Sequence, residues 1–511
     1  MKQDISEILK KIRNVLSQAD YETAKENLEK LVNALESNDK PLIDATLNIL
    51  IELEKKYFPL IPENKTLAEK LKPDVLISTV GFRAEPVILT ILTLKPSIVY
   101  LLHSTESIKI AIKILEDKYI EDLGTKFRLK EVSEYDATKN YRVIKEILEE
   151  VGKDKNKKIV IDATAGRKMM ASSLSSAAFY FHLPMVYLHA KEFKNTVLPF
   201  SEILREVENP FDYYGDYDLK LVEELFNSHF YDAAVKTCES MRSYIRDPAT
   251  KAKIELLKDL ISVYSDWDAF MHSKYFDNNQ REGLLLSERL KSVVNDFKKF
   301  NLQNNLPENV ENNITFLEKL DESFRNALNI VDEYRIVDIY LNALRKGTDK
   351  QAKYDDGIAR LYRCVEMCFT YRLKRDLLID DVSHPDYNEL CKNKGISISE
   401  LQDKFKEASG RDLRLGEPLG LYNQVNLLKS FFPDDEMVKI YESMKEKEIK
   451  MRNRSILAHG TRPSTEEDWR TFKNKTIQII KLTIGKDSFE KLAKEKTGLG
   501  WHGKISLHPK K

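Results

Sequence analysis

The stretch Ile159-Val160-Ile161-Asp162-Ala163-Thr164-Ala165-Gly166-Arg167-Lys168 decides the fold expected for the first half of this chain. Its apolar start predicts a short buried strand, and the residues after it predict a turn into a helix. Turns of this kind hold phosphates or nucleotides, because free backbone amides at a helix N-terminus point toward the ligand. The stretch therefore predicts both a sheet and a ligand site.

Four more buried-strand patterns accompany this stretch, at residues 75–80, 97–102, 127–132 and 185–188. Helical patterns separate them, with one helix expected to begin near Glu85-Pro86 and another to cover about 107–116. Strands that alternate with helices at this spacing indicate a parallel, doubly wound sheet over roughly residues 71–205.

Four turns are expected to converge at the carboxyl ends of these strands, where such sheets bind ligands. Gly81 permits close backbone approach, and the hydroxyls of Thr79 and Thr164 can donate hydrogen bonds. Asp162 and Thr164 also suit capping of the following helix, which is compatible with binding. The candidate ligand-binding residues are Thr79, Gly81, Phe82, Arg83, Ser104, Thr105, Asp162, Thr164, Ala165, Gly166, Arg167 and Lys168, and the turn Asp136-Ala137-Thr138 falls on the same rim.

Helical patterns dominate the rest of the chain, which at 511 residues is too long for one hydrophobic core. The expected fold class is α/β plus all-α. We expect an N-terminal helical extension at 1–70, the sheet domain at 71–210, a helical connector at 211–345 and an all-helical domain at 346–511.

Composition narrows the class of protein. Lys plus Arg and Asp plus Glu both total 82, so any nucleic acid must be held by a local site and not by global charge. The four cysteines, Cys238, Cys364, Cys368 and Cys391, form no Cys-x-x-Cys pair and are expected to be buried thiols. No apolar run is long enough to span a membrane, so we expect a soluble, cytoplasmic protein.

A second informative stretch, Arg452-Asn453-Arg454-Ser455-Ile456-Leu457-Ala458-His459, precedes Gly460 near the C-terminus. It continues a charged helix expected from Met437 to Leu457, and Gly460 is expected to stop that helix. On an unbroken helix, at about 100 degrees per residue, Arg452 lies nearly in line with His459. A kink near Ser455 would favour Arg454, so both arginines remain candidates.

These residue types suit RNA cleavage without a metal. Histidine titrates in the range needed for general acid–base chemistry, and the arginine guanidinium binds phosphate oxygens in a fork. The alternative is that His459 caps its helix and the arginines solvate it.

Other polar residues of the C-terminal half are expected to be structural. Arg360, Arg363 and Glu366 share one helical face and suit an ion-pair stripe, and Tyr354-Asp355-Asp356 suits a helix N-terminus better than a metal site. We predict no metal site. Trp469, Trp501 and His502 could stack on RNA bases or belong to the core.

The two stretches together resemble a known family. Arg452 to Gly460 resembles the Arg-x(4 to 6)-His motif of HEPN ribonucleases, and Asp162 to Lys168 resembles the Asp-x-Thr-x-Gly-x-Lys turn of Rossmann-like CARF sensor domains. In this order they resemble the CRISPR-associated CARF-HEPN ribonucleases of type III systems, over about residues 71–511. Lys168 matches the family lysine by spacing, whereas Arg167 adds a second cation.

The resemblance implies an allosteric enzyme. A cyclic oligoadenylate, tetra- or hexa-adenylate, would bind across two CARF domains of a homodimer and activate a composite HEPN site that cuts single-stranded RNA, with no cofactor. It assigns catalysis to Arg452, Asn453, Arg454 and His459. Arg83 and Glu85 could read adenine edges or pair with each other.

Two alternatives remain open from the sequence. The chain could bind the messenger and regulate a partner without RNase activity. The CARF domain could also act as a ring nuclease that degrades the messenger, with Lys168 or Thr164 orienting a 2'-hydroxyl for attack.

Overall fold

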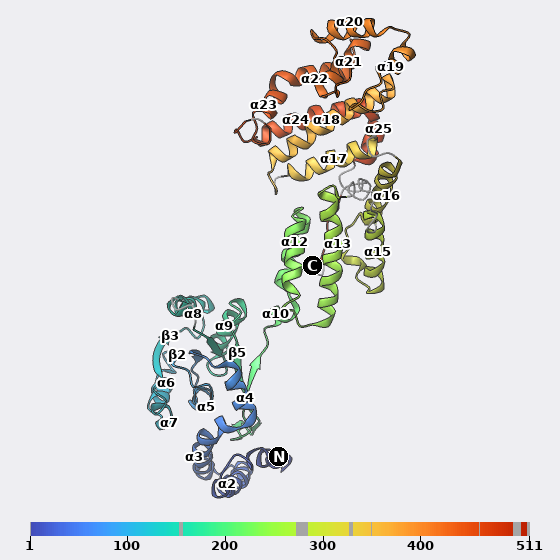
Figure 1. Cartoon of the computed structure of the whole chain (residues 1–511). Helices are drawn as coiled ribbons and strands as arrows, with labels where there is room; N and C mark the ends of the chain where they lie inside the picture. Colours follow the sequence, from blue (N-terminus) through green and yellow to red (C-terminus); the bar gives the residue numbers. More distant parts are fainter. Residues whose placement is uncertain are drawn as a thin grey trace. The chain divides into compact units, whose positions relative to one another are not determined.

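The computed structural model describes residues 2–152, 157–271, 285–326, 331–348, 350–458, 460–493 and 502–507. The chain forms two compact units, Met1–Tyr213 and Tyr214–Lys511. Figure 1 shows strands and helices together in the first unit and helices throughout the second. The expected fold class, α/β plus all-α, is confirmed.

A six-stranded sheet forms the centre of the first unit, in the order β3-β2-β1-β4-β5-β8. All five expected strands are present, and neighbours among them pair in parallel. The strands are β1 (Val75–Thr79), β2 (Ile98–His103), β3 (Lys126–Glu131), β4 (Ile159–Asp162), β5 (Met185–His189) and β8 (Ile203–Val207).

Three strands were not predicted from the sequence. The edge strand β8 runs antiparallel to β5 and places Arg205 opposite Tyr187. Its central charged pair, Arg205-Glu206, interrupts the apolar pattern on which strand prediction rests, so pairing with β5 determines its conformation. The hairpin of β6 (Glu192–Phe193) and β7 (Thr196–Val197) is too short to leave a pattern.

Helices cover both faces of the sheet, as doubly wound architecture requires. Leu76 and Leu101 point into a core with α4, α5, α6 and α7, whereas Val75, Ile77 and Tyr100 point into a core with α8 and α9. The helices are α4 (Pro62–Leu71), α5 (Glu85–Leu94), α6 (Ile108–Leu115), α7 (Lys118–Glu121), α8 (Ala137–Gly152) and α9 (Lys168–Tyr180). The central strands β1, β2 and β4 are therefore buried on both sides, which explains their continuous apolar runs.

The N-terminal helical pattern forms α1 (Lys2–Ile12), α2 (Gln18–Ser37) and α3 (Lys40–Tyr57), followed by a 3-10 turn at Phe58–Leu60. These helices pack on the chain before β8, since Leu198 and Phe200 lie in their core. The Nζ of Lys11 donates to the carbonyl oxygen of Glu202 at 2.7 Å. The extension expected at 1–70 is thus part of the first compact unit.

The second unit is helical throughout its described residues, apart from 3-10 turns, a π turn and an isolated bridge. Its helices are α11 (Asp216–Asn227), α12 (Tyr231–Met241), α13 (Pro248–Asp268), α15 (Leu286–Lys299), α16 (Val310–Asn326), α17 (Glu333–Lys346), α18 (Tyr354–Leu377), α19 (Tyr387–Lys394), α20 (Ile398–Ser409), α21 (Leu421–Phe431), α22 (Glu436–Met444), α23 (Lys450–Asn453), α24 (Glu466–Ile484) and α25 (Lys486–Leu492). The short α10 (Pro210–Tyr214) precedes them.

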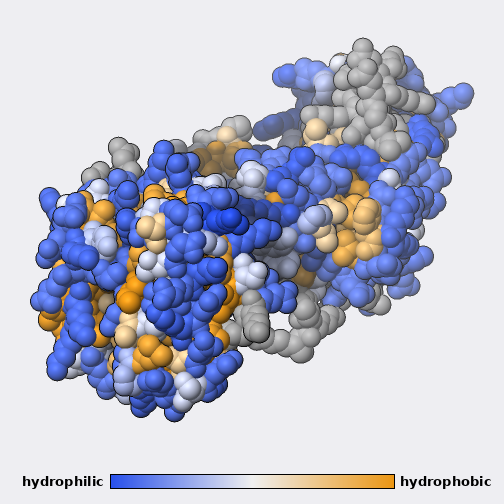
Figure 2. All heavy atoms as spheres, turned by 90° about the horizontal axis from the view of Figure 1, so that it is seen from below, coloured by the Kyte–Doolittle hydropathy of each residue, from blue (hydrophilic) through white to orange (hydrophobic). Residues whose placement is uncertain are grey.

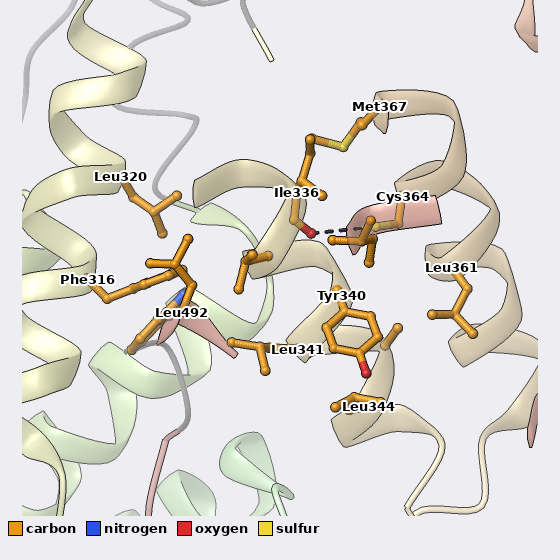
Figure 3. Close-up of a cluster of buried hydrophobic side chains, with 14 of the residues drawn as sticks. Phe316, Leu320, Ile336, Tyr340, Leu341, Leu344, Leu361, Cys364, Met367 and Leu492 are labelled. Carbon is orange, nitrogen blue, oxygen red and sulfur yellow. Dashed lines mark hydrogen bonds between the residues drawn. The ribbon is translucent and has the colours of Figure 1, made fainter. Parts of the chain in front are cut away.

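One hydrophobic core joins the connector helices to the C-terminal helices. Figure 3 shows Phe316 and Leu320 of α16 beside Leu341 of α17 and Leu492 of α25. In the same core the Sγ of Cys364 donates to the carbonyl oxygen of Ile336 at 3.5 Å. All four cysteines are free and buried, so the predicted buried thiols are confirmed.

The last described residues, 502–507, run back into the connector helices. The Asn227 side chain bonds both the carbonyl oxygen and the amide of Ile505, at 3.0 and 2.9 Å. His502 is fully buried, and its Nδ1 lies 2.7 Å from the Tyr231 hydroxyl. Trp469 is also buried, against Gly347 and Gly357. Both aromatic side chains belong to the core, while Trp501 lies outside the described residues.

The surface is polar in character. Figure 2 shows mainly hydrophilic side chains on the face that it presents, with smaller hydrophobic areas between them. Among the described helices, none combines the length and apolarity required to cross a bilayer.

Candidate functional site: a pocket at the sheet rim and an arginine-rich turn

A pocket of about 870 Å³ opens at the carboxyl ends of the strands. The strand order reverses between β1 and β4, so the loops that follow these two strands lead to opposite faces and leave a crevice between them. The pocket is lined by Gly81, Phe82, Arg83, Pro86, Glu134, Tyr135, Ala165, Gly166, Arg167, Lys168 and Met169.

Two glycines allow the loops after β1 and β4 to meet. A Cβ on Gly81 would lie 2.8 Å from the backbone nitrogen of Gly166, which no side chain tolerates without a shift. Gly166 itself has φ +91°, and a Cβ there would lie 3.0 Å from that of Thr79. The close approach expected for Gly81 is therefore an approach to the neighbouring loop.

Seven of the predicted ligand-binding residues line the pocket: Gly81, Phe82, Arg83, Ala165, Gly166, Arg167 and Lys168. The others lie beside or below it. Thr79 is buried and donates its hydroxyl to the carbonyl oxygen of Ala165. Ser104 is buried and bonds Ser107, whereas Thr105 is exposed outside the lining.

Asp162 and Thr164 fix the loop after β4 from beneath. The Asp162 carboxylate accepts from the Ser78 hydroxyl at 2.8 Å and from the Thr164 amide at 3.0 Å. Burial raises the pKa of Asp162, and these hydrogen bonds oppose the shift. The Thr164 Oγ1 also accepts from the Leu188 amide at 2.8 Å. Both side chains hold the loop in the position that the pocket requires.

Arg167 lies at the centre of a charged cluster in the pocket. Its guanidinium pairs with Glu106 at 2.6 Å and with Glu134 at 3.0 Å, and it stacks 5.6 Å from the centroid of the Phe82 ring. Arg83 pairs with Glu85 at 3.4 Å. Of the two roles left open for Arg83 and Glu85, the structure shows the mutual pair.

Sequence reasoning missed four lining residues: Pro86, Glu134, Tyr135 and Met169. It did place the turn after the third strand at the rim, but through Asp136-Ala137-Thr138. Asp136 instead accepts from the Lys139 amide at 3.0 Å within the first turn of α8. Glu134 and Tyr135, which precede that turn, line the pocket. The end of β3 at Glu131 could have indicated this, because the residues that follow a strand lie at the rim of the sheet.

The second candidate segment follows a long helix that ends earlier than expected. The chain continues from α22 through a π turn at Lys445–Ile449 into α23, which ends at Asn453. The helix expected from Met437 to Leu457 is therefore too long by four residues at its C-terminal end. The Ser455 amide bonds the Arg452 carbonyl at 3.0 Å, which closes a tight turn. π turns occur frequently at functional sites.

The arginines of this segment have different surroundings. The Arg452 guanidinium stacks 4.3 Å from the centroid of the Tyr362 ring on α18 and donates to Oδ1 of Asn453 at 3.1 Å. Burial raises the pKa of the Tyr362 phenol, and Arg452 opposes the shift. Arg454 is exposed and, among the described residues, makes no side-chain hydrogen bond or ion pair. His459 lies outside the described residues, so the choice between the arginines stays open.

A closed loop follows the motif. The Gly460 amide donates to the Ser455 carbonyl at 3.1 Å, and the Arg462 amide donates to the Arg454 carbonyl at 3.2 Å. Asp355 at the start of α18 accepts from the Ser464 hydroxyl at 2.6 Å. Asp355 therefore tethers this loop from the first turn of α18, at the helix N-terminus that the sequence predicted. Gly460 does not stop the helix but packs against the Arg454 carbonyl, and Arg462 is a further cation that the sequence did not single out.

The remaining polar candidates of this unit are ion pairs. Arg363 pairs with Glu366 at 2.5 Å, as expected, whereas Arg360 pairs with Asp356 at 3.3 Å. Within the described parts of the chain, no three His, Cys, Asp or Glu side chains come together to hold a metal.

Two family models match the helical half. Residues 312–483 match the model described as the Csm6 HEPN domain, and residues 214–317 match the Csm6 6H domain. Together they cover a little over half of the chain and include the Arg452 segment. This chain belongs to the Csm6 family. The CARF-HEPN resemblance expected from the sequence is confirmed, and the Csm6 HEPN model takes in α17, which the sequence placed in the connector.

Solved structures extend the comparison of this Csm6-family chain. Csm6 of Enterococcus italicus, bound to cyclic hexa-2'-fluoro-hexa-dAMP, is 12% identical with a TM-score of 0.46, over 82% of this chain and 96% of that one. Can2 of Sulfobacillus thermosulfidooxidans, in complex with cyclic tetra-adenylate, is 14% identical with a TM-score of 0.22, over 40% of this chain and 67% of that one. No curated protein matches the chain in sequence.

Proposed function

We propose that this Csm6-family chain is a cyclic oligoadenylate-activated, metal-independent endoribonuclease that cuts single-stranded RNA in type III CRISPR antiviral defence. The observation that carries the proposal is the match of residues 312–483 to the Csm6 HEPN domain, because that match contains the Arg452-to-His459 segment. Activity, activator and RNA substrate all belong to the proposal.

The chemistry assigned to the segment needs three functions. His459 takes the proton of a 2'-hydroxyl, whose oxygen attacks the adjacent phosphorus, and a protonated histidine gives a proton to the leaving 5'-oxygen. The guanidinium of Arg452 or Arg454 neutralises the phosphorane. The products are a 2',3'-cyclic phosphate and a 5'-hydroxyl. The step needs one histidine as base and one as acid, whereas the motif contains one histidine, so we propose a homodimer in which two protomers each supply a copy.

The pocket at the sheet rim is assigned to the activator. Its volume, about 870 Å³, is within the range of small-molecule sites, and the α9 N-terminus and Lys168 suit a phosphate. Exposed Phe82 and Tyr135 offer faces on which bases can stack. Ligand binding activates RNA cleavage only if the ligand binds more tightly to one arrangement of the two HEPN domains in the homodimer than to the other.

A fluorogenic RNA assay with cyclic tetra- and hexa-adenylate supplied separately tests the proposal. One ring should raise RNA cleavage well above the basal rate, with EDTA present throughout. His459→Ala should abolish cleavage and leave ring binding, measured by calorimetry, unchanged. Ring binding without any RNA turnover would instead support the regulator without RNase activity, and full activity of His459→Ala would end the catalytic assignment.

Ring-nuclease activity is a second candidate, favoured by the position of Lys168 in the pocket lining. Thr164 suits it less, since its Oγ1 already bonds Asp162 and Leu188. Labelled cyclic adenylate incubated with the full-length His459→Ala protein should be converted to linear product if this activity exists. Lys168→Ala should then prevent the conversion.

A further inference from the structure

Glu134 lines the pocket, and its two carboxylate oxygens have different surroundings. Its side chain is 9% exposed, and Oε2 lies 3.0 Å from the Nε of Arg167. The other oxygen, Oε1, is buried and has no hydrogen-bond partner among the described residues. A buried acceptor left without a donor is unfavourable, so a ligand that supplies the donor binds more tightly.

An ion pair with Arg167 holds the Glu134 carboxylate. Arg167, its ion-pair partner, is also fixed by Glu106 at 2.6 Å and by the Phe82 ring at 5.6 Å. The guanidinium paired with Oε2 has two further contacts, so the ion pair restrains the carboxylate at the pocket lining. Glu134 is therefore a hydrogen-bond acceptor held by its neighbours, unlike a charged side chain that is surrounded by solvent.

The charge of Glu134 decides which part of a cyclic oligonucleotide it can face. An ionised carboxylate accepts hydrogen bonds only, and it repels phosphate oxygens. The donors on such a ring are the amino groups of the bases and the ribose 2'-hydroxyls. Phe82 and Tyr135, which are 63% and 78% exposed, line the same pocket and favour a stacked base beside the carboxylate.

We infer that Glu134 selects adenine in this pocket by accepting a hydrogen bond from the 6-amino group of a bound base. Guanine and hypoxanthine carry an oxygen at that position, which would meet Oε1 as a second acceptor. The inference rests on the proposed function, since it specifies how the activator is recognised.

Binding to the full-length protein tests the inference. Calorimetry compares the cyclic oligoadenylate that binds best with four rings of the same size: the hypoxanthine ring, the ring of unsubstituted purine, and the 2'-deoxy forms of the adenine and purine rings. The wild-type protein should bind the adenine ring about tenfold or more tightly than the hypoxanthine and purine rings. Its preference for adenine over purine should persist between the corresponding 2'-deoxy rings.

Three variants sharpen the test. Glu134→Ala should bind the adenine and purine rings alike. Glu134→Gln should turn its amide oxygen toward Arg167 and its NH₂ into the pocket, and so shift preference toward hypoxanthine, which a folding defect cannot produce. Glu106→Ala, the matched control, removes another partner of Arg167 from outside the lining and should keep the discrimination.

Two results overturn the inference alone: Glu134→Ala still discriminates adenine from purine, or removal of the 2'-hydroxyl abolishes the effect of Glu134. In both cases the wild-type protein still binds and responds to the adenine ring, so the proposed function stands. Failure of the wild-type protein to bind any cyclic oligoadenylate overturns the proposed function and this inference with it.

Discussion

At the scale of single residues, contacts with α18 give the two motif arginines unequal freedom. Arg452 lies 4.3 Å from the Tyr362 ring, whereas Arg454 is exposed. Since a cation held on an aromatic face loses little further entropy when it meets a phosphate, we predict that Tyr362 positions Arg452 for RNA cleavage.

Replacement of the Tyr362 ring tests this role. Tyr362→Leu should lower ring-activated RNA cleavage roughly two- to fivefold, since an exposed cation–π contact contributes about 0.5–1 kcal/mol. Tyr362→Phe keeps the aromatic face and should retain nearly full activity. Initial rates at saturating RNA, measured beside those of Arg452→Ala, make the comparison. Equal losses in the Leu and Phe variants would contradict a role of the ring.

Buried histidines make the stability of the second unit depend on pH. Burial lowers the pKa of His229 to about 3, and it lowers that of His502 well below its usual range. Each group is neutral in the folded state, while the unfolded chain takes up a proton below about pH 6.5. The contribution of each histidine to the free energy of unfolding is therefore complete above about pH 6.5. It is lost as the pH falls toward 3, at about 1.4 kcal/mol per pH unit for each proton that the unfolded chain takes up.

His229→Asn should reduce this acid sensitivity, because asparagine tolerates the left-handed backbone at φ 64° and does not titrate. All three tryptophans lie in the second unit, so urea unfolding followed by tryptophan fluorescence reports on it. The loss of stability between pH 7 and 5 should be smaller than in the wild-type protein. His384→Asn, which changes a side chain that is 87% exposed, should leave the loss unchanged. Buried Asp338, whose pKa is raised to about 7, has the opposite effect on stability as the pH falls. Asp338 is present in both the wild-type protein and the variant, so its effect cancels when the two are compared.

At the scale of elements, the loop after α23 depends on a glycine. A Cβ on Gly460 would lie 2.0 Å from the Arg454 carbonyl oxygen, which is backbone and cannot swing aside. Any side chain here must therefore open the turn that follows Asn453.

Gly460→Ala should reduce RNA cleavage by about tenfold or more, since misplacement by about 1 Å can cost a factor of roughly one hundred. Cyclic oligoadenylate binding should be unaffected. Gly420→Ala is the matched control, because a Cβ there meets nothing within 4 Å. Wild-type activity of the Gly460 variant would show that the geometry of this loop is irrelevant to the chemistry.

At the scale of the whole molecule, the proposed sensor pocket and the proposed nuclease segment belong to different compact units. If ligand binding at one changes affinity at the other, linkage makes the effect reciprocal. The His459→Ala protein is expected to bind RNA without cutting it, and this would allow both affinities to be measured at equilibrium.

Cyclic oligoadenylate should raise the RNA affinity of that variant by a certain factor, and RNA should raise its affinity for the ring by the same factor, within error. Typical coupling of about 1–3 kcal/mol corresponds to roughly 5- to 150-fold. Fluorescence anisotropy with each labelled partner in turn makes the measurement. A factor of one in both titrations would mean that the ring acts on catalysis without changing RNA affinity.

The sequence by itself determined the parallel sheet, the helical second half and the two candidate segments, because local apolar periodicity and short polar turns specify them. Tertiary structure decided what no local pattern encodes: the strand β8, stabilised by its pairing with β5, and the end of the motif helix at Asn453. It also brought Glu134 and Tyr135 into the pocket and buried Thr79 and Asp162 beneath it. Residue type shows what a side chain can bind, whereas packing between distant segments determines whether it faces a ligand or the core.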